Sequence, residues 1–519
     1  STQKRAEAGM AHGSVPQTPA QSRTPVLGQH GLPARQPWAV LVLLCVAEFM
    51  VILDITVVNV ALPSIGRALG LGAAGLPWVV TAYVLMTGGL TLLGGRAADL
   101  LGRKRVFLAG LALFTAASLA SGLAPAAGLL IGARAAQGLG AALLTPAALS
   151  VITATYAGAQ RATALSVWGA LGAAGAAVGV LLGGVLTSWL GWRSVFLINV
   201  PVGAAAWILA GRLIPRPATG GHGLTRLDPP GALLGVTGLG TAIYAITSAP
   251  GHGWASAWTI GLLLLAAALL ATFALAERVA RDPLFPPRAW RNRRLASGAL
   301  VMLGATSVLV AAFFLGSLYL QNVLGDSPVR AGLGFLPLVL VIGAGAHLAS
   351  RLLGRAGSRV LAAAGLTLMA GGALLLAQAT AAAGYPGLLP GFLVLGFGTG
   401  LVLPAASVTA LTDTGPEDAG FASGFLATAH ELGAALGVAV FTAIAEAAIS
   451  TAPINTAPIN TAPINTGGAG AMMTGAGFAA GYHRAFIVAA GVAAVLAVLT
   501  LVAGPVVRPA PGARAHGPH

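Results

Sequence analysis

The chain has 519 residues, of which 56 % are hydrophobic and only 8 % are charged. A water-soluble globule would carry about 25 % charged residues, so the composition excludes that class and indicates an integral membrane protein. The formal net charge of +15 suits either nucleic-acid binding or basic loops on one side of a membrane, and the positions of the bases decide between them. The one cysteine, Cys45, lies in an apolar run and can form no disulfide within the chain.

Residues 1–37 are polar and contain no apolar segment, which predicts a disordered cytoplasmic tail and not a signal peptide. Fourteen apolar runs of about 20 residues follow and predict transmembrane helices, because in lipid an open chain must satisfy its backbone groups within each segment. The runs lie near 38–62, 76–95, 105–124, 128–150, 162–188, 195–212, 229–248, 256–276, 296–320, 332–350, 359–382, 386–410, 421–447 and 484–505.

The basic residues lie mostly in every second loop. With the N-terminus inside the cell, twenty-three of the 28 bases fall on the inner side, and four (Arg67, Arg193, Arg330 and Arg484) fall in outer loops. The remaining base, Arg134, lies within a run. Cytoplasmic loops of membrane proteins carry this excess. We therefore expect both termini in the cytoplasm, and the net charge is explained without nucleic acid.

The chain contains an internal repeat. "GLGAALLTPAA" at 138–148 and "GFGTGLVLPAA" at 396–406 share six residues at one offset, and the same offset relates two Gly-x-x-x-Gly pairs at 175–179 and 433–437. Paired helical repeats are the basis of alternating access in secondary transporters. We predict an all-α membrane fold with two six-helix bundles at 38–214 and 296–505, two inserted helices with cytoplasmic loops at 215–295, and a cytoplasmic tail at 506–519.

A charged stretch, "GGRAADLLGRKR" at 94–105, joins the second and third runs. Glycine gives a tight turn its backbone freedom, and the bases suit an anionic inner leaflet. A merely positive inner loop explains the bases but neither the acid nor the glycine spacing. The stretch resembles the G-x-x-x-D-x-x-G-R-[KR] loop of the major facilitator superfamily. The resemblance implies an inner gate made of Gly95, Asp99, Gly102, Arg103 and Lys104.

Five further stretches resemble one branch of that superfamily. They are "LDITVVNVALPSIG" (53–66), "RAAQGLG" (134–140), "WRSVFLINVPVG" (192–203), "YLQNVLGDSPVRAGLGFLP" (319–337) and "GFASGFLATAHELGAALG" (420–437). With fourteen spans, they are similar to the drug:proton antiporter family of bacterial multidrug and antibiotic exporters. The resemblance implies proton-coupled export of hydrophobic or cationic small molecules across the bacterial inner membrane. Its implied partners are a drug or antibiotic, protons and membrane lipid.

The fifth run carries glycines at helical spacing. Gly175, Gly179 and Gly183 share one helix face and allow close packing, and Gly184 completes a Gly-Gly pair. The family's antiporter motif has Pro after the glycine at 179, whereas this chain has Val180. The departure removes the bend that Pro would impose and weakens the indication of export direction that the motif carries.

Ionisable side chains inside the apolar runs are functional candidates, because an ionised group there costs about 2.5–3.5 kcal/mol. Asp54 is our first candidate for proton coupling. Glu431, Arg134 and Glu48 are the further candidates for that role. Burial favours a protonated carboxyl and a neighbouring guanidinium favours the ionised form. The resemblance places the fourth run beside the first, so Arg134 should neighbour Asp54 or Glu48. A purely structural ion pair is the alternative.

Polar and aromatic side chains within the runs are candidates for lining a substrate cavity. They are Asn59, Tyr83, Gln137, Tyr319, Gln321 and His430. Gln137 follows Arg134 by three residues and shares its helix face. For His430, a hydrogen bond between helices is the simpler interpretation. For Glu431, in the middle of its run, proton coupling and recognition of a cationic substrate both remain open.

The sequence indicates no enzyme, cofactor or metal site. "HELGA" at 430–434 begins like a zinc-binding H-E-x-x-H motif but has Ala434 at the second ligand position. Neither Lys4 nor Lys104 follows a glycine, which excludes a Walker A loop and an ATP-driven pump. The alternatives to an exporter are an importer or metabolite facilitator on the same fold and a sensor or scaffold without transport. The repeat "TAPINTAPINTAPINT" at 451–466 predicts a flexible outer linker.

Overall fold

The computed structural model describes residues 36–72, 75–156, 158–214, 229–280, 292–412, 419–450 and 475–505. The predicted tail at 506–519, the linker at 451–466 and the tail up to residue 35 lie outside the described residues. The described residues form helices and no strand. This is the outcome expected when each backbone group has to be satisfied within its own segment.

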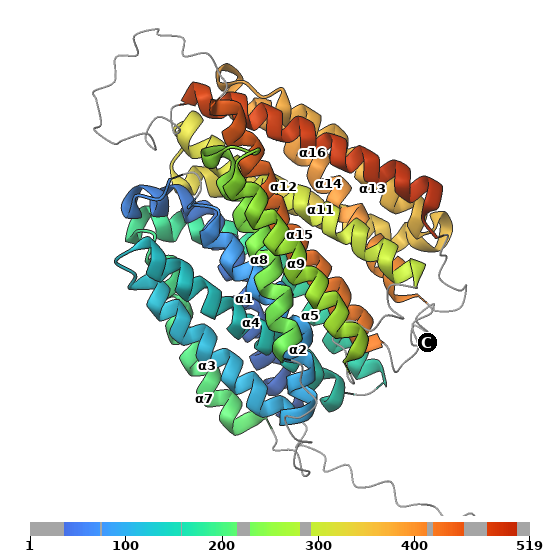
Figure 1. The fold of residues 1–519 in the computed structure, drawn as a ribbon. Helices are drawn as coiled ribbons and strands as arrows, with labels where there is room; N and C mark the ends of the chain where they lie inside the picture. Colours follow the sequence, from blue (N-terminus) through green and yellow to red (C-terminus); the bar gives the residue numbers. More distant parts are fainter. Residues whose placement is uncertain are drawn as a thin grey trace, which may run out of the picture.

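The helices form two halves with a hairpin between them in sequence (Figure 1). The N-terminal half consists of α1 (Gln36–Leu69), α2 (Trp78–Leu101), α3 (Arg103–Gly122), α4 (Ala127–Thr155), α5 (Gly158–Leu190), α6 (Ser194–Leu197) and α7 (Asn199–Leu213). The hairpin consists of α8 (Pro229–His252) and α9 (Ala257–Val279). The C-terminal half consists of α11 (Arg293–Leu318), a π-helix (Tyr319–Val323), α12 (Pro328–Ala356), α13 (Ser358–Ala377), a short 3₁₀ helix (Ala381–Ala383), α14 (Gly384–Leu411), α15 (Ala419–Ser450) and α16 (Gly475–Ala503).

Thirteen candidate membrane spans lie within the described residues. They include α6 and α7 together, as one span from Ser194 to Leu213. The fifth predicted run, at 162–188, is not among these thirteen and corresponds to the long helix α5, whose apolar part is Ala177–Leu190. Three of the four bases expected in outer loops lie within helices instead. They are Arg67 near the end of α1, Arg330 near the start of α12 and Arg484 in the first part of α16.

The sequence repeat recurs as a repeat of helix packing. Gly138 of α4 packs on the carbonyl of Tyr83 in α2, and Gly396 of α14 packs on the carbonyl of Leu338 in α12. In the same way, α5 packs on α1 and α15 packs on α11. A side chain at these glycines would overlap backbone atoms, so small residues fix the closest approach of the helices. The two halves therefore share one packing scheme.

The halves meet along two pairs of helices, α2 with α15 and α5 with α12. Two side chains of α11 and the π-helix also bond to α1. Ser317 Oγ donates to the carbonyl of Asn59 over 2.7 Å, and Gln321 Nε2 donates to the carbonyl of Val60 over 2.8 Å. The hairpin lies over one of these seams, since α8 packs on both α2 and α15, with α9 outside it (Figure 1).

Candidate functional site

The centre of the N-terminal half holds a buried ion pair. Asp54 of α1 is 0 % exposed and Arg134 of α4 is 1 % exposed. Arg134 Nη1 donates to Asp54 Oδ2 over 2.5 Å, and Nε donates to the carbonyl of Val79 over 2.9 Å. The guanidinium carbon also lies 4.3 Å from the ring centre of Tyr83. Since a buried charge is costly unless it is paired, each ion neutralises the other. Of the two predicted neighbours of Arg134, the structure selects Asp54 and not Glu48.

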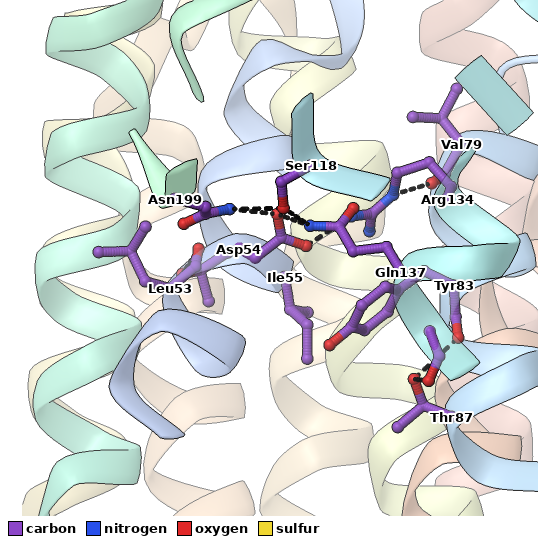
Figure 2. A network of polar contacts seen from close by, with 12 residues as sticks. Leu53, Asp54, Ile55, Val79, Tyr83, Thr87, Ser118, Arg134, Gln137 and Asn199 are labelled. Carbon is purple, nitrogen blue, oxygen red and sulfur yellow. Dashed lines mark hydrogen bonds and ion pairs between the residues drawn. The ribbon is translucent and has the colours of Figure 1, made fainter. Parts of the chain in front are cut away.

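Two amides complete the environment of the carboxylate. Gln137 Nε2 and Asn199 Nδ2 donate to Asp54 Oδ1 over 2.8 and 3.0 Å. Gln137 is itself fixed, because its Oε1 accepts from Arg134 Nη1 over 2.8 Å and its Nε2 also donates to Ser118 Oγ over 2.7 Å. Figure 2 shows these side chains converging on Asp54 from several helices. The carboxylate thus faces donors on both oxygens, an arrangement that suits an anion.

This network can respond to a proton. Its side chains come from α1, α3, α4 and α7, which all belong to the N-terminal half. A proton on Asp54 would remove the charge that neutralises Arg134 and leave a buried guanidinium without its counter-ion. Removing one partner of a buried pair costs about 3–5 kcal/mol. Loss of the charge on Asp54 would therefore destabilise the contact between α1 and α4 at this pair.

Glu48 is a second buried carboxyl with a separate partner. It lies six residues before Asp54 on α1, is 7 % exposed, and its Oε2 accepts from Thr145 Oγ1 of α4 over 2.9 Å. Glu48 and Asp54 thus have different neighbours, as their positions on different faces of one helix require.

Glu431 lies at the contact between the halves. A Cβ atom added to Gly88 of α2 would lie 2.6 Å from the Cβ of Glu431, so α2 and α15 meet here without a side chain between them. The Glu431 side chain is 17 % exposed and that of its neighbour His430 is 43 % exposed, with 3.4 Å between His430 Nδ1 and Glu431 Oε1. In contrast to Asp54, this carboxyl is partly accessible.

The structure does not gather the predicted cavity residues into one cavity. Asn59 Nδ2 donates to the carbonyl of Ile55 in its own helix over 2.9 Å. Gln321 donates to α1 and so ties the two halves together. Both amides are drawn to nearby backbone carbonyls, because a buried amide without a partner is costly.

The aromatic candidates are also separated from one another. Tyr83 lies under Arg134, and Gln137 belongs to the Asp54 network. Tyr319 is 0 % exposed, and its ring centre lies 4.5 Å from that of Tyr482 in α16. Stacking of this kind stabilises the inside of the C-terminal half. Of the six predicted cavity residues, only His430 is both accessible and next to a predicted coupling carboxyl.

The charged stretch at 94–105 is helical at both ends, which corrects the expectation of a loop. α2 continues through Gly95 and Asp99, and α3 begins at Arg103, so the turn consists of Gly102 alone. Its φ of 95° lies in the region that favours glycine. The helix continues past Gly95 because no proline or other strong breaker precedes Gly102.

Lys104 holds the end of α7. Its Nζ donates to the carbonyls of Gly211 and Ile214 over 2.8 and 2.5 Å. The last carbonyls of a helix lack partners within it, and a cation there is favourable. Lys104 therefore joins α3 to α7 within one half, while Arg103 is exposed. The side chain of Asp99 lies outside the described part of the chain, so the inner gate stays a prediction.

The glycines of the fifth run lie at two helix contacts. Gly175, Gly179 and Gly183 pack on Ile52, Thr56 and Val57 of α1, respectively. Gly184 faces the other half, and a Cβ atom added to it would lie 2.7 Å from the carbonyl oxygen of Pro328 in α12. The first three glycines thus allow close packing of α5 on α1 within the N-terminal half. Gly184 allows close packing of α5 on α12 of the other half.

We expect Gly184→Ala to shift the protein away from the conformation described here. The added methyl group overlaps the Pro328 carbonyl, and overpacking of this kind costs about 1–3 kcal/mol, which changes a ratio of two conformations by about 5- to 150-fold. Spin labels at the exposed Trp189 and Leu333 should report a longer distance between α5 and α12. Gly128→Ala is the control, since nothing lies within 4 Å of its added Cβ atom. Equal distances in both variants would contradict the prediction.

Three members of the site are not among the residues predicted from the sequence. Ser118 and Asn199 complete the Asp54 network, and Thr145 bonds to Glu48. Asn199 could have been predicted, because it is an amide side chain inside the apolar stretch "WRSVFLINVPVG". Ser118 and Thr145 carry no such signal, because many hydroxyl groups in membrane helices bond only to their own backbone.

The geometry defines a class of protein. Two halves with one packing scheme, a charged network buried inside one half and a partly accessible carboxyl between the halves are features of a secondary transporter. Within the described residues, no group of three or more potential metal ligands lies together.

Comparison with known proteins identifies the family. The model of the "Major Facilitator Superfamily" matches residues 44–438. The puromycin resistance protein of Streptomyces alboniger is 41% identical over 80% of this chain and 83% of its own length. The cephamycin export protein of Amycolatopsis lactamdurans is 42% identical over 78% of this chain and 84% of its own. This chain therefore belongs to the major facilitator superfamily, in the branch of bacterial drug:proton antiporters that its sequence predicted.

Solved structures agree on the fold. A bacterial homologue of the human lysosomal transporter Spinster, in an inward-facing and unoccupied conformation, aligns with a TM-score of 0.64 and 17% identity over 91% of this chain and 98% of its own. A POT family transporter aligns with a TM-score of 0.62 and 14% identity over 89% and 95% of the two chains. The predicted major facilitator fold is confirmed.

Proposed function

We propose that the protein exports hydrophobic or cationic small molecules, antibiotics among them, in exchange for protons. The names of its relatives support the substrate class, since the proteins from Streptomyces alboniger and Amycolatopsis lactamdurans are described by puromycin resistance and cephamycin export. A third relative, the lincomycin resistance protein of Streptomyces lincolnensis, is 37% identical over 79% of this chain. An importer or metabolite facilitator on the same fold is the second candidate function.

The Asp54–Arg134 pair is the observation that carries the proton coupling. Both of its side chains are almost fully buried. A secondary transporter that moves substrate uphill must gain free energy from an ion, and a buried carboxyl whose counter-ion depends on its charge can link a proton to helix movement. We assign coupling first to Asp54, tuned by Arg134, with Glu48 and Glu431 as further candidates.

The topology belongs to the same proposal. The excess of bases in alternate loops supports cytoplasmic termini in a bacterial inner membrane. In that orientation Gly102 and Lys104, both members of the predicted gate, lie at the cytoplasmic end of the N-terminal half. The predicted units at 38–214 and 296–505 would then move against each other, with 215–295 between them.

Export from proteoliposomes tests the function. Purified protein is reconstituted, a pH gradient is imposed, and efflux of ethidium and chloramphenicol is followed with and without a protonophore. An exporter moves substrate uphill only while the gradient lasts. Expression in a drug-sensitive host separates the alternatives, because an exporter lowers drug accumulation, an importer raises it, and a scaffold changes neither. Uphill efflux at the same rate with and without the pH gradient would overturn the proposed proton coupling.

Glu431→Gln is expected to reduce transport of the cation ethidium at least about tenfold more than transport of the neutral chloramphenicol. The carboxylate is partly accessible at the contact between the halves, and loss of its attraction for a cation by about 1.4 kcal/mol corresponds to that ratio. Glu446→Gln is the matched control on the same helix, since Glu446 is 5 % exposed and should affect both substrates equally. Equal loss of both substrates in Glu431→Gln would make Glu431 a coupling residue instead.

A further inference from the structure

An apolar groove runs along the outside of the C-terminal half between α11 and α16. It consists of two adjoining hollows of about 200 and about 490 Å³, which share Leu300 and Leu496 in their walls. The first hollow reaches Ser297 and Thr500, and the second reaches Ser307 and Gly491. The walls of both are almost entirely apolar. The residues that line the groove all belong to the C-terminal half, so it is not part of the contact between the halves.

The length and depth of the groove match one leaflet of a bilayer. From Ser297 to Ser307, α11 rises by ~15 Å at 1.5 Å per residue, which is half of a hydrocarbon core of ~30 Å. One end lies where α11 begins and α16 ends, which is the level of the lipid headgroups. The other end lies near the middle of the two helices. A groove with these limits fits an acyl chain that enters from one membrane surface.

The headgroup end of the groove carries a positive charge. Arg359, in the first turn of α13, lines the first hollow together with the ends of α11 and α16. Basic pockets between transmembrane helices on the cytoplasmic side bind anionic lipid headgroups. In the proposed topology Arg359 lies on that side. A neutral substrate would gain nothing from this arginine, and a cationic one would be repelled by it.

We propose that the groove between α11 and α16 binds one anionic phospholipid, with an acyl chain along α11 and its phosphate at Arg359. The bound lipid would pack against the face of α11 that lines the groove. Beside the groove, α11 packs on α15, where Gly433 lies against the carbonyl of Leu303. Ser307, which also lines the groove, donates its Oγ hydrogen bond to the Gly433 carbonyl over 2.8 Å. Gly433 is two residues from Glu431, so the bound lipid stabilises the helix contact next to the partly accessible carboxyl.

Native mass spectrometry of the full chain tests the binding. The protein in non-ionic detergent is offered equal amounts of dioleoyl phosphatidylglycerol and dioleoyl phosphatidylcholine, and the retained lipids are counted. The wild-type protein should retain one phosphatidylglycerol in preference to phosphatidylcholine. Arg359→Gln should reduce that preference about fivefold, the ratio that one basic residue near an anionic surface supplies. Arg355→Gln is the matched control, because Arg355 is exposed on the neighbouring helix and does not line the groove.

A second pair of variants tests the place of the acyl chain. Gly491 lines the groove and nothing lies within 4 Å of a Cβ atom added to it, so the ring of Gly491→Phe should occupy the hollow and prevent retention of both lipids. Gly261→Phe on α9 has equal free space outside the groove and should leave retention unchanged. All four variants are compared as intact monomers.

Three results would overturn the proposal. They are equal lipid preference in Arg359→Gln and Arg355→Gln, equal retention in Gly491→Phe and Gly261→Phe, and competitive displacement of the lipid by ethidium, which would make the groove a substrate site. The assay measures retained lipid and needs no transport. A failure here is therefore distinguishable from a failure of the proposed export.

Discussion

Asn in place of Asp54 is expected to abolish uphill export driven by a pH gradient, while substrate still binds and equilibrates downhill. The amide has the size of the carboxyl but cannot titrate. It also offers an NH₂ group to a position that faces the donors of Arg134, Gln137 and Asn199, so its oxygen can satisfy only part of them. Efflux from proteoliposomes with and without a gradient, together with substrate binding to the purified protein, measures both parts of the expectation.

Two further variants make this result specific. Ser118→Ala removes a neutral member of the same network, whose hydroxyl bonds to Gln137, and should retain most gradient-driven efflux. Glu48→Gln removes the other buried carboxyl of α1 and should reduce efflux less than the change at Asp54. If Asp54→Asn retained full gradient-driven efflux, Asp54 would be structural, and the coupling role would pass to Glu431 or Glu48.

Arg134→Gln is expected to lower the free energy of unfolding by about 3–5 kcal/mol, because it leaves the buried Asp54 carboxylate without its counter-ion. Thermal unfolding of the purified protein in detergent measures the loss. Arg105→Gln is the control, since Arg105 is exposed near the end of the same half, and exposed substitutions usually change stability by less than about 0.5 kcal/mol.

A double variant separates charge neutralisation from other roles of the arginine. Asp54→Asn combined with Arg134→Gln removes both charges, so it should recover a substantial part of the stability lost in Arg134→Gln alone. It should not recover gradient-driven export, since no titratable group is restored. A double variant as unstable as Arg134→Gln would show that Arg134 stabilises the fold through its contacts with Tyr83 and the Val79 carbonyl instead.

Much of the fold could be predicted because backbone groups in lipid must form hydrogen bonds within the protein, which helices achieve. Long apolar runs indicate helices whatever their neighbours, and the repeated glycines at 138–148 and 396–406 mark equivalent helix contacts in the two halves. The ends of helices were harder to predict. The stretch at 94–105 looks like a loop by its charge, but a charged helix end at the membrane surface has the same composition. Only the backbone shows that Gly102 alone makes the turn.

Site residues could be predicted from the sequence where burial of that residue type has a single explanation. Asp54 and Arg134 stand out because ions in apolar runs are costly, and they do form a pair. Tyr319 and Gln321 fit a cavity lining equally well by sequence, but a tyrosine ring also packs in a core and an amide also bonds to a backbone carbonyl. Which of these uses prevails depends on neighbours far away in the sequence, such as Tyr482 and Val60.

The hairpin of α8 and α9 makes the two sides of the transporter unequal. α8 packs over the seam between α2 and α15. Glycines allow its close packing on α2, where Gly89 lies against Val236 and Gly240 lies against Leu85. Among the described helices, none outside the two halves packs along the seam between α5 and α12. A molecule that approached the region between the halves from the bilayer would therefore meet α8 at the flank of α2 and α15, and no further described helix at the flank of α5 and α12.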